Sequence, residues 1–297
     1  MTWLYATLAA YFLFAAVSLF DRRLLTQIRD SLTYTFYVGL LGAAALLAAP
    51  FTGFFIPQKE TLFYCFLAAL AYFIFLFLMY KGLEKIEASR IIPAMGAFLP
   101  IFTFVFVGFK ELPSYQTFSS FLLLLLGSFL VTLERSKKIS LQNFFWPAAI
   151  AFFASLSFFL SKEVYLTLPF WTGFIWIRIF VFFMALLLLF SAKVRAEVFG
   201  RKKSFSGAKS LLFCANQSFG AAAFVLQSWG VALAGFSMLP VINALQGAQY
   251  AVLFILAAVL SARFPSFFKE NIKGEIALQK IFAIMVISLG LLFLFLK

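Results

Sequence analysis

Residues 61–80 read TLFYCFLAALAYFIFLFLMY, a stretch without a single charged side chain. A helix of about 20 residues spans about 30 Å, which is the thickness of the hydrocarbon core of a bilayer, so this stretch predicts a transmembrane helix. The rest of the chain has the same character: of its 297 residues 64% are hydrophobic, 12% are charged, and none is a histidine. The composition therefore indicates an integral membrane protein.

Further apolar stretches of similar length lie on both sides of this one, separated by short connections. The predicted spans are residues 3–20, 33–50, 61–80, 89–109, 116–133, 143–161, 170–191, 209–232, 236–262 and 278–296. The expected fold class is therefore an all-α integral membrane protein with ten transmembrane helices. Connections this short leave no room for a separate soluble domain, which argues against a hidden catalytic or nucleic-acid-binding domain.

Lys and Arg alternate strongly from one connection to the next. The odd-numbered connections hold nearly all of them, whereas the even-numbered ones hold only Lys59, Lys110 and Lys162. Short loops rich in Lys and Arg stay in the cytoplasm, so the odd connections are expected to face the cytoplasm and both termini to face outside. The same rule accounts for the net charge of +13 without a nucleic-acid partner. We expect a multi-pass protein of the cytoplasmic membrane.

The sequence also repeats itself once. Pro93, within IPAMGA, and Pro240, within LPVINA, each lie early in the fourth span of a half. Later in each half, a glutamine is followed by a Leu-Gly pair at identical spacing, and these residues are Gln116 with Gly127 and Gln279 with Gly290. The predicted repeats are residues 1–138 and 139–297. Because each holds five spans, an odd number, the second must be inverted in the membrane, an arrangement typical of secondary transporters.

The runs YKGLEKIEASRIIP at 80–93, LPI at 99–101, KELP at 110–113 and GEIALQ at 274–279 resemble the drug/metabolite transporter superfamily, EamA-type. The resemblance covers essentially the whole chain. It implies two five-helix repeats around a central cavity and the transport of small metabolites, often as export. Ten-helix members of that family are usually drawn with both ends in the cytosol, whereas the charges here place both ends outside.

Arg178 is the one charged side chain deep within a predicted span. It lies eight residues into the seventh span, roughly 12 Å along the helix. Charged groups at such depth are costly and tend to mark a transport pathway, so one interpretation is a contact with an anionic group or a charge that holds the cavity in one state. The alternative is an arginine that extends to the lipid head groups or fixes the packing of a helix.

The eighth and ninth spans carry most of the uncharged polar residues. Asn216 and Gln227 are eleven residues apart and so share one helix face, and Asn243, Gln246 and Tyr250 share another. If both faces point inward, they form a patch of amide and hydroxyl groups suited to a zwitterionic or hydroxylated solute. The alternative is a set of hydrogen bonds that hold helices together.

Three prolines lie in the fourth and ninth spans. Pro93, Pro100 and Pro240 each remove a backbone hydrogen bond from a predicted helix. They are candidate hinges beside the cavity, with static kinks as the alternative.

Several kinds of chemistry have no candidate residues. All carboxylates fall at or near the end of a span, so proton exchange through a deep carboxylate is not expected. Cys65 and Cys214 stand alone within spans and fit no metal-binding spacing, and neither a metal nor a cofactor is expected. Outside the spans, residues 193–209 predict a basic cytoplasmic loop that meets anionic lipid, and residues 263–277 predict a short interfacial helix.

Together these features predict a carrier for a small polar metabolite that works by alternating access, as a monomer or homodimer in the lipid bilayer. A flippase for a lipid-linked substrate is the main alternative within transport. A non-transporting membrane scaffold and a membrane enzyme are the alternatives from other classes.

Overall fold

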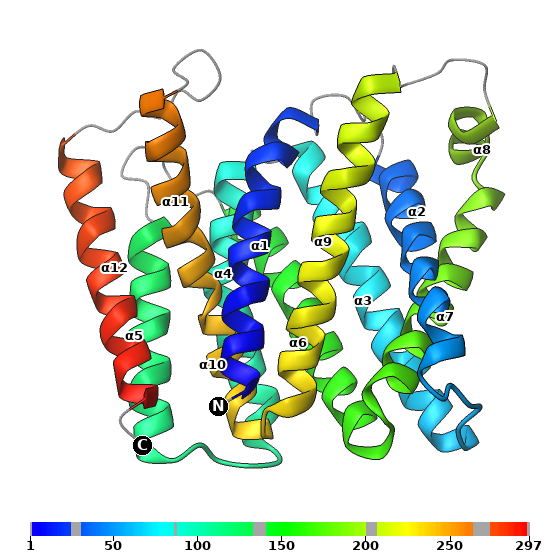
Figure 1. Cartoon of the computed structure of the whole chain (residues 1–297), viewed down its shortest axis with the longest axis horizontal. Coiled ribbons are helices and arrows are strands. Elements are labelled where there is room, and N and C mark those ends of the chain that lie inside the picture. Colours follow the sequence, from blue (N-terminus) through cyan, green and yellow to red (C-terminus); the bar gives the residue numbers. More distant parts are fainter. Residues whose placement is uncertain are drawn as a thin grey trace. The chain divides into compact units, whose positions relative to one another are not determined.

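The computed structural model describes residues 2–24, 31–85, 88–132, 141–199, 207–263 and 274–295. All regular secondary structure in these residues is helical, and they contain no strand (Figure 1). A helix or a run of helices lies over each apolar stretch that the sequence predicts. The helices are α1 (Thr2–Leu24), α2 (Ser31–Leu41), η2 (Gly42–Phe51), α3 (Lys59–Lys85), α4 (Ala88–Gly108), α5 (Tyr115–Thr132), α6 (Leu141–Thr167), α7 (Phe170–Leu187), η3 (Leu188–Phe190), α8 (Ala192–Phe199), α9 (Gly207–Leu233), η4 (Phe236–Met238), α10 (Leu239–Ala244), α11 (Gln246–Arg263) and α12 (Gly274–Phe295).

Among the described residues, five helical segments are long and apolar enough to cross a membrane. They are Ser31–Phe51, Lys59–Glu84, Phe145–Thr167, Phe170–Phe190 and Phe236–Leu256. Shorter apolar helices lie at Thr2–Ser18, Ala94–Gly108, Tyr115–Leu130 and Leu278–Leu294. The all-helical membrane fold is thus confirmed, while the number of helices that cross the bilayer stays a prediction.

The helices differ from the expected stretches in several places. The second stretch continues from α2 into the 3₁₀ segment η2, which contains Pro50. The ninth stretch is divided into η4, α10 and α11, and the seventh connection contains the additional short helix α8. Hydropathy detects the apolar length of a segment but not a local change in its hydrogen bonding, so these breaks were not expected. Most of the segment 263–277, expected to hold an interfacial helix, lies outside the described residues.

The chain forms two compact units, and each combines segments from both halves of the sequence. Unit 1 consists of residues 1–25, 107–138 and 213–297, and it contains α1, α5, most of α9, α10, α11 and α12. Unit 2 consists of residues 26–106 and 139–212, and it contains α2, α3, nearly all of α4, α6, α7 and α8. The predicted repeats are contiguous in sequence, whereas the compact units are assembled across the boundary between them.

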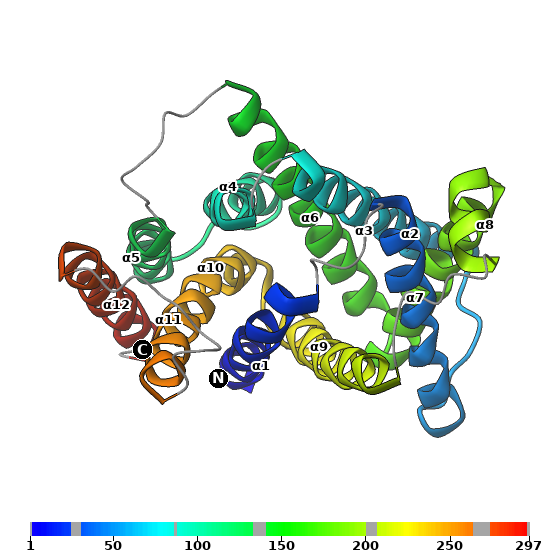
Figure 2. The ribbon, with the colours of Figure 1, turned by 90° about the horizontal axis from the view of Figure 1, so that it is seen from above.

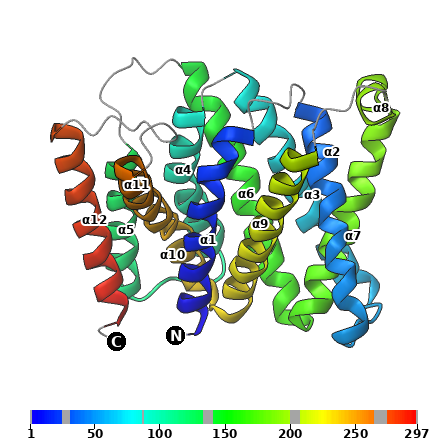
Figure 3. The ribbon, with the colours of Figure 1, turned by 45° about the horizontal axis from the view of Figure 1, so that its top comes forward.

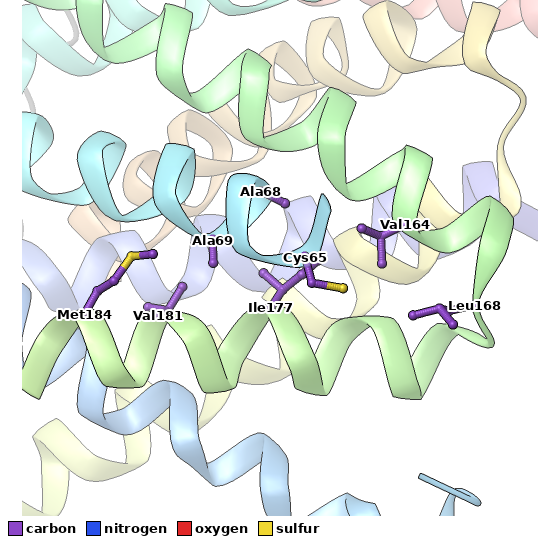
Figure 4. Close-up of a cluster of buried hydrophobic side chains, with 8 residues drawn as sticks. All are labelled: Cys65, Ala68, Ala69, Val164, Leu168, Ile177, Val181 and Met184. Carbon is purple, nitrogen blue, oxygen red and sulfur yellow. The ribbon is translucent and has the colours of Figure 1, made fainter. Parts of the chain in front are cut away.

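The core of unit 2 is formed where α3, α6 and α7 pack together (Figure 4). Small residues of α3, among them Ala68 and Ala69, let α6 and α7 approach closely, and Cys65 is buried as one more small side chain in this apolar cluster. A Cβ atom at Gly173 would lie only 2.7 Å from Val164 Cγ1, so glycine at that position allows the close α6–α7 hairpin. A second cluster joins α4 to α6 through Ile91, Met95, Leu99, Ile150, Ala151 and Ala154.

Unit 1 also relies on glycine for close helix packing. A Cβ atom at Gly127 of α5 would lie 3.1 Å from the backbone nitrogen of Ile287 in α12, and one at Gly290 of α12 would lie 3.1 Å from the backbone nitrogen of Leu124 in α5. Gly230 of α9 faces Thr7 of α1 in the same way. Figure 2 shows α5 and α12 side by side. Small residues at helix crossings are the usual means of close packing in membranes, where apolar burial alone gives helices little reason to associate.

Candidate functional site

The most distinctive local feature of unit 1 is the junction between α10 and α11. Leu245 lies between the two helices and donates its N–H to Val241 O at 2.9 Å. Ala248 then donates to Leu245 O at 2.9 Å, a bond that spans three residues where an α-helical bond spans four. The regular ladder is therefore interrupted here, and carbonyl groups at such a helix end need partners from elsewhere.

Two side-chain hydroxyls from other helices bond to carbonyls at this junction. Tyr11 Oη of α1 donates to Ile242 O at 2.9 Å. Ser128 Oγ of α5 is 2.9 Å from Ala244 O and 2.7 Å from Leu124 O of its own helix. A carbonyl left without a partner in an apolar environment costs several kcal/mol, so both hydroxyls stabilise the interrupted helix.

Gly247 makes the second of these bonds possible. A Cβ atom at position 247 would lie 2.9 Å from Ser128 Cβ and 3.0 Å from Ser128 Cα, and the backbone of α5 could not yield to it cheaply. The absence of a side chain therefore lets α5 approach the junction closely enough for its serine to reach the Ala244 carbonyl. Ser128 itself is buried.

A glutamine extends the junction to a third helix. Gln227 Nε2 of α9 donates to Tyr11 Oη at 3.2 Å, so the tyrosine hydroxyl accepts one hydrogen bond and donates another. Both side chains are buried. The chain of bonds from Gln227 through Tyr11 to Ile242 O connects α9, α1 and α10.

The other polar residues predicted from the eighth and ninth spans also lie in unit 1. Asn243 is in α10, next to Ile242, and is 1% exposed. Gln246 begins α11 and is half-buried, Tyr250 follows one turn later and is buried, and Asn216 is buried in α9 about three turns before Gln227. The structure thus brings Gln227 to the junction that contains Asn243. Asn216 lies about three turns earlier in α9, away from the hydrogen bonds of the junction.

Arg178 belongs to unit 2, so it is in a different compact unit from the other five predicted binding residues. It lies in α7 and is 8% exposed. Its Cζ atom is 4.4 Å from the ring centroid of Tyr72 in α3 and 5.3 Å from that of Phe174 one turn earlier in α7. Contacts of this kind combine cation–π attraction with stacking of the flat guanidinium group.

The prolines do not coincide with the interruption. Pro93 and Pro100 both lie within α4, which is assigned as one α-helix from Ala88 to Gly108. Pro240 lies in the first turn of α10, where a missing N–H is tolerated because that group has no partner within the helix. The break falls at Leu245 instead. The role of the three prolines as hinges stays a prediction.

Comparison with known proteins finds a family match in the first part of the chain. Residues 1–133 match the EamA-like transporter family. This match confirms the resemblance to the drug/metabolite transporter superfamily over the first predicted repeat. No curated protein matches the chain. One solved structure, described only as "Crystal structure of protein", aligns with a TM-score of 0.66 at 15% identity, covering 97% of this chain and 98% of the other, which shows a shared fold.

Over residues 1–133 the chain is therefore similar to a family of transporters. The described residues contain no group of three or more His, Cys, Asp or Glu side chains that could hold a metal ion. The polar groups at the junction are instead amides, hydroxyls and backbone carbonyls, which can exchange hydrogen bonds with a solute without any change of charge.

Sequence reasoning missed four residues that the structure makes prominent. Tyr11, Ser128 and Tyr72 are single polar or aromatic residues within apolar spans, and nothing in their spacing relates them to partners far along the chain. Lys162 was counted as part of a connection, but α6 continues to Thr167 and Lys162 is 2% exposed within it. The sequence feature that misled the prediction is the charged pair Lys162 and Glu163 at the end of an apolar run. Hydropathy declines there although the helix continues.

Proposed function

We propose that this protein is a secondary transporter with ten transmembrane helices in two inverted five-helix repeats, and that it moves a small polar metabolite across the cytoplasmic membrane by alternating access. The reciprocal packing of α5 against α12 is the observation that carries this proposal. The proposed residues that contact the solute are Arg178, Asn216, Gln227, Asn243, Gln246 and Tyr250.

The contacts between α5 and α12 are repeated when the two helices are exchanged. Gln116 Nε2 of α5 donates to Phe293 O of α12 at 2.8 Å, and Gln279 Nε2 of α12 donates to Leu130 O of α5 at 2.8 Å. Positions 116 and 279 are 163 residues apart, and so are positions 130 and 293. Exchange of the two helices therefore converts one hydrogen bond into the other.

The glycine contacts obey the same offset. Gly127 packs on Ile287 and Gly290 packs on Leu124. The N-terminal part of each helix meets the last turn of the other, so the two helices are antiparallel. Exchange of two antiparallel helices corresponds to a twofold rotation about an axis perpendicular to them. For helices that span a bilayer, such an axis lies in the membrane plane, as it does between inverted repeats.

A second pair of hydrogen bonds also supports the repeats. Tyr11 Oη of α1, the first helix of the first half, donates to Ile242 O of α10 in the fourth span of the second half. Ser155 Oγ of α6, the first helix of the second half, donates to Leu99 O of α4 in the fourth span of the first half, at 2.8 Å. The first bond lies within unit 1 and the second within unit 2. Each unit therefore joins the first helix of one half to the fourth helix of the other.

The nature of the buried polar groups favours a small polar solute. Amide and hydroxyl side chains around the α10–α11 junction can both donate and accept hydrogen bonds, and the guanidinium of Arg178 can bind a carboxylate or phosphate group. In secondary transporters, interrupted helices commonly lie beside the substrate because their backbone groups are available there. The charge pattern of the connections supports two outside termini, and the family supports export as the direction.

The test is transport by the purified full-length protein in liposomes. A panel of amino acids, nucleosides and sugars is first screened for solutes that raise the melting temperature, and each hit is then measured by counterflow of labelled solute. We expect saturable counterflow that Asn243→Ala reduces at least tenfold. Gln217→Leu, which removes a half-buried glutamine from α9 outside the proposed site, serves as the matched control and should retain transport.

Other outcomes would overturn the proposal. Movement of a labelled lipid-linked substrate without movement of any soluble one would indicate a flippase. Equal loss of counterflow in Asn243→Ala and Gln217→Leu would contradict the assignment of Asn243 to the solute-binding site. Chemical conversion of a solute would indicate an enzyme, and no movement of any solute or lipid would indicate a non-transporting membrane protein.

A further inference from the structure

The short helix α8 follows directly after the end of α7. The segment Phe170–Phe190 is long and apolar enough to cross a membrane, and α8 begins two residues beyond it, at Ala192. Arg195 N–H donates to Ser191 O at 3.1 Å, which starts the new helix immediately after the extended residue Ser191. Figure 3 shows α8 beyond the end of α7 and close to the start of α2. If α7 spans the bilayer, α8 is thus held at the level of the lipid head groups.

The two sides of α8 differ in chemistry. Val194 is fully buried against unit 2, while Lys193 and Arg195 are exposed on either side of it. Large aromatic side chains stand at both ends of the segment: Phe190 is 82% exposed and Phe199 is 74% exposed. Exposed cations combined with exposed aromatic rings are typical of helices that lie in the membrane interface, where the rings enter the acyl boundary and the cations meet phosphate groups.

The position of α8 is fixed by contacts with α2. Thr33 Oγ1, in the first turn of α2, donates to Glu197 Oε2 of α8 at 3.2 Å. The one carboxylate of α8 therefore accepts a hydrogen bond from α2, and Val194 is buried on the side of α8 that packs against the rest of unit 2. A helix anchored in this way can hold two cations at fixed places on the surface of unit 2, which a flexible loop could not do.

We propose that α8 is an interfacial helix that binds anionic phospholipid through Lys193 and Arg195, with Phe190 and Phe199 inserted at the boundary of the acyl chains. The occupant is a phospholipid with a net negative head group, because the exposed charges of α8, two cations against the carboxylate of Glu197, sum to a positive charge. A zwitterionic head group offers no net charge to match. The inference requires that α7 spans the membrane and does not depend on transport. Basic residues close to a membrane surface contribute about 1 kcal/mol each to binding anionic lipid.

The test uses the full-length protein in neutral detergent, titrated with phosphatidylglycerol or with phosphatidylcholine while lipid binding is measured. We expect tighter binding of phosphatidylglycerol to the wild type. The double variant Lys193→Gln/Arg195→Gln should weaken that binding about thirtyfold and leave phosphatidylcholine binding unchanged. The control variant Lys59→Gln/Lys110→Gln removes two exposed lysines at other places and should bind as the wild type does.

Three results would each overturn this inference. One is equal weakening in both double variants, which would indicate a general effect of net charge. Another is equal binding of the two lipids by the wild type. The last is inorganic phosphate competing with phosphatidylglycerol at millimolar concentration, which would indicate a site for a free anion. Melting temperatures without lipid verify that the variants fold, and the solute assays of the transport proposal are independent of all these measurements.

Discussion

Gln116 and Gln279 each donate a side-chain hydrogen bond to a carbonyl in the last turn of the helix that carries the other. Phe293 lies in the last four residues of α12 and Leu130 in the last four of α5. The last four carbonyls of an α-helix have no partner within the helix. Each glutamine therefore satisfies a group that would otherwise depend on water or lipid head groups, and the pair joins α5 to α12 at both ends.

We expect Gln279→Leu to destabilise the protein by about 1 kcal/mol, since hydrogen bonds between membrane helices contribute about that much. Gln116→Leu should cost less, because its bond is exposed and water can replace the amide. The two bonds lie at opposite ends of a helix pair, so the costs should add in the double variant. Thermal unfolding in detergent checks this, with Gln217→Leu as the control. A strongly non-additive double variant would show that the two bonds are not independent.

The contact between Gly247 and Ser128 gives a prediction about the helix junction. Gly247→Ala should destabilise the protein by about 1–3 kcal/mol, because the new Cβ would overlap the side chain and backbone of Ser128. Adding Ser128→Gly removes the side-chain atoms that clash, Oγ and Cβ, and should restore part of the stability. Gly108→Ala, at a position where a Cβ meets nothing within 4 Å, is the matched control. Failure of Ser128→Gly to rescue the variant would show that the conflict lies elsewhere.

The hydroxyl of Tyr11 joins Gln227 to the Ile242 carbonyl. Tyr11→Phe removes one atom and leaves both partners without that bond, so we expect a loss of about 1–3 kcal/mol of stability. Gln227→Leu in the same background should cost less than it does in the wild type, because the partner hydroxyl is already absent. The four melting curves of this double-mutant cycle measure the coupling. Additive effects would mean that the two side chains act separately.

The contact between Arg178 and Tyr72 predicts a specific pattern of substitutions. Tyr72→Phe keeps the aromatic face and should preserve stability and transport, whereas Tyr72→Leu removes the face over which Arg178 lies. Arg178→Lys should also impair the protein, because an ammonium group cannot stack as a planar guanidinium does. The assays are thermal unfolding and liposome counterflow. Equal effects of Tyr72→Phe and Tyr72→Leu would rule out a role for the ring.

The orientation predicted from the charges can be measured with single cysteines in a background that lacks Cys65 and Cys214. A cysteine at position 59 or 110 should react with a membrane-impermeant reagent in intact cells, and one at position 193 should react only after the cells are opened. All three positions are exposed. The reverse pattern would place both termini in the cytoplasm and would also place α8 at the outer surface.

Much of the fold could be predicted from particular stretches of sequence. The apolar run at 61–80 and its counterparts predicted where helices occur, because an apolar segment of that length buries its backbone polar groups only as a helix. The matching positions of Gln116 and Gln279 were also found from spacing alone. Their interaction was not, since equal spacing predicts a repeat without showing which helices meet.

The candidate site could be predicted only in part. Asn243 and Gln227 were recognised because amides are conspicuous in apolar spans, but the α10–α11 break and the hydroxyls of Tyr11 and Ser128 were not. The bond from Ser128 to the junction depends on the close contact of Gly247 with a helix far away in sequence, and burial of Lys162 depends on how far α6 continues beyond its apolar run.

The sequence by itself determined the apolar helical segments of a membrane protein and the strong charge asymmetry of its connections, because hydropathy and charge are properties of each segment and of the solvent around it. Only the tertiary structure decided which polar groups meet: Tyr11 with Gln227 and Ile242, Arg178 with Tyr72, and each of two glutamines with the other's helix. Such pairings depend on helix contacts between residues more than a hundred positions apart, and no local pattern encodes which partner lies within hydrogen-bond reach.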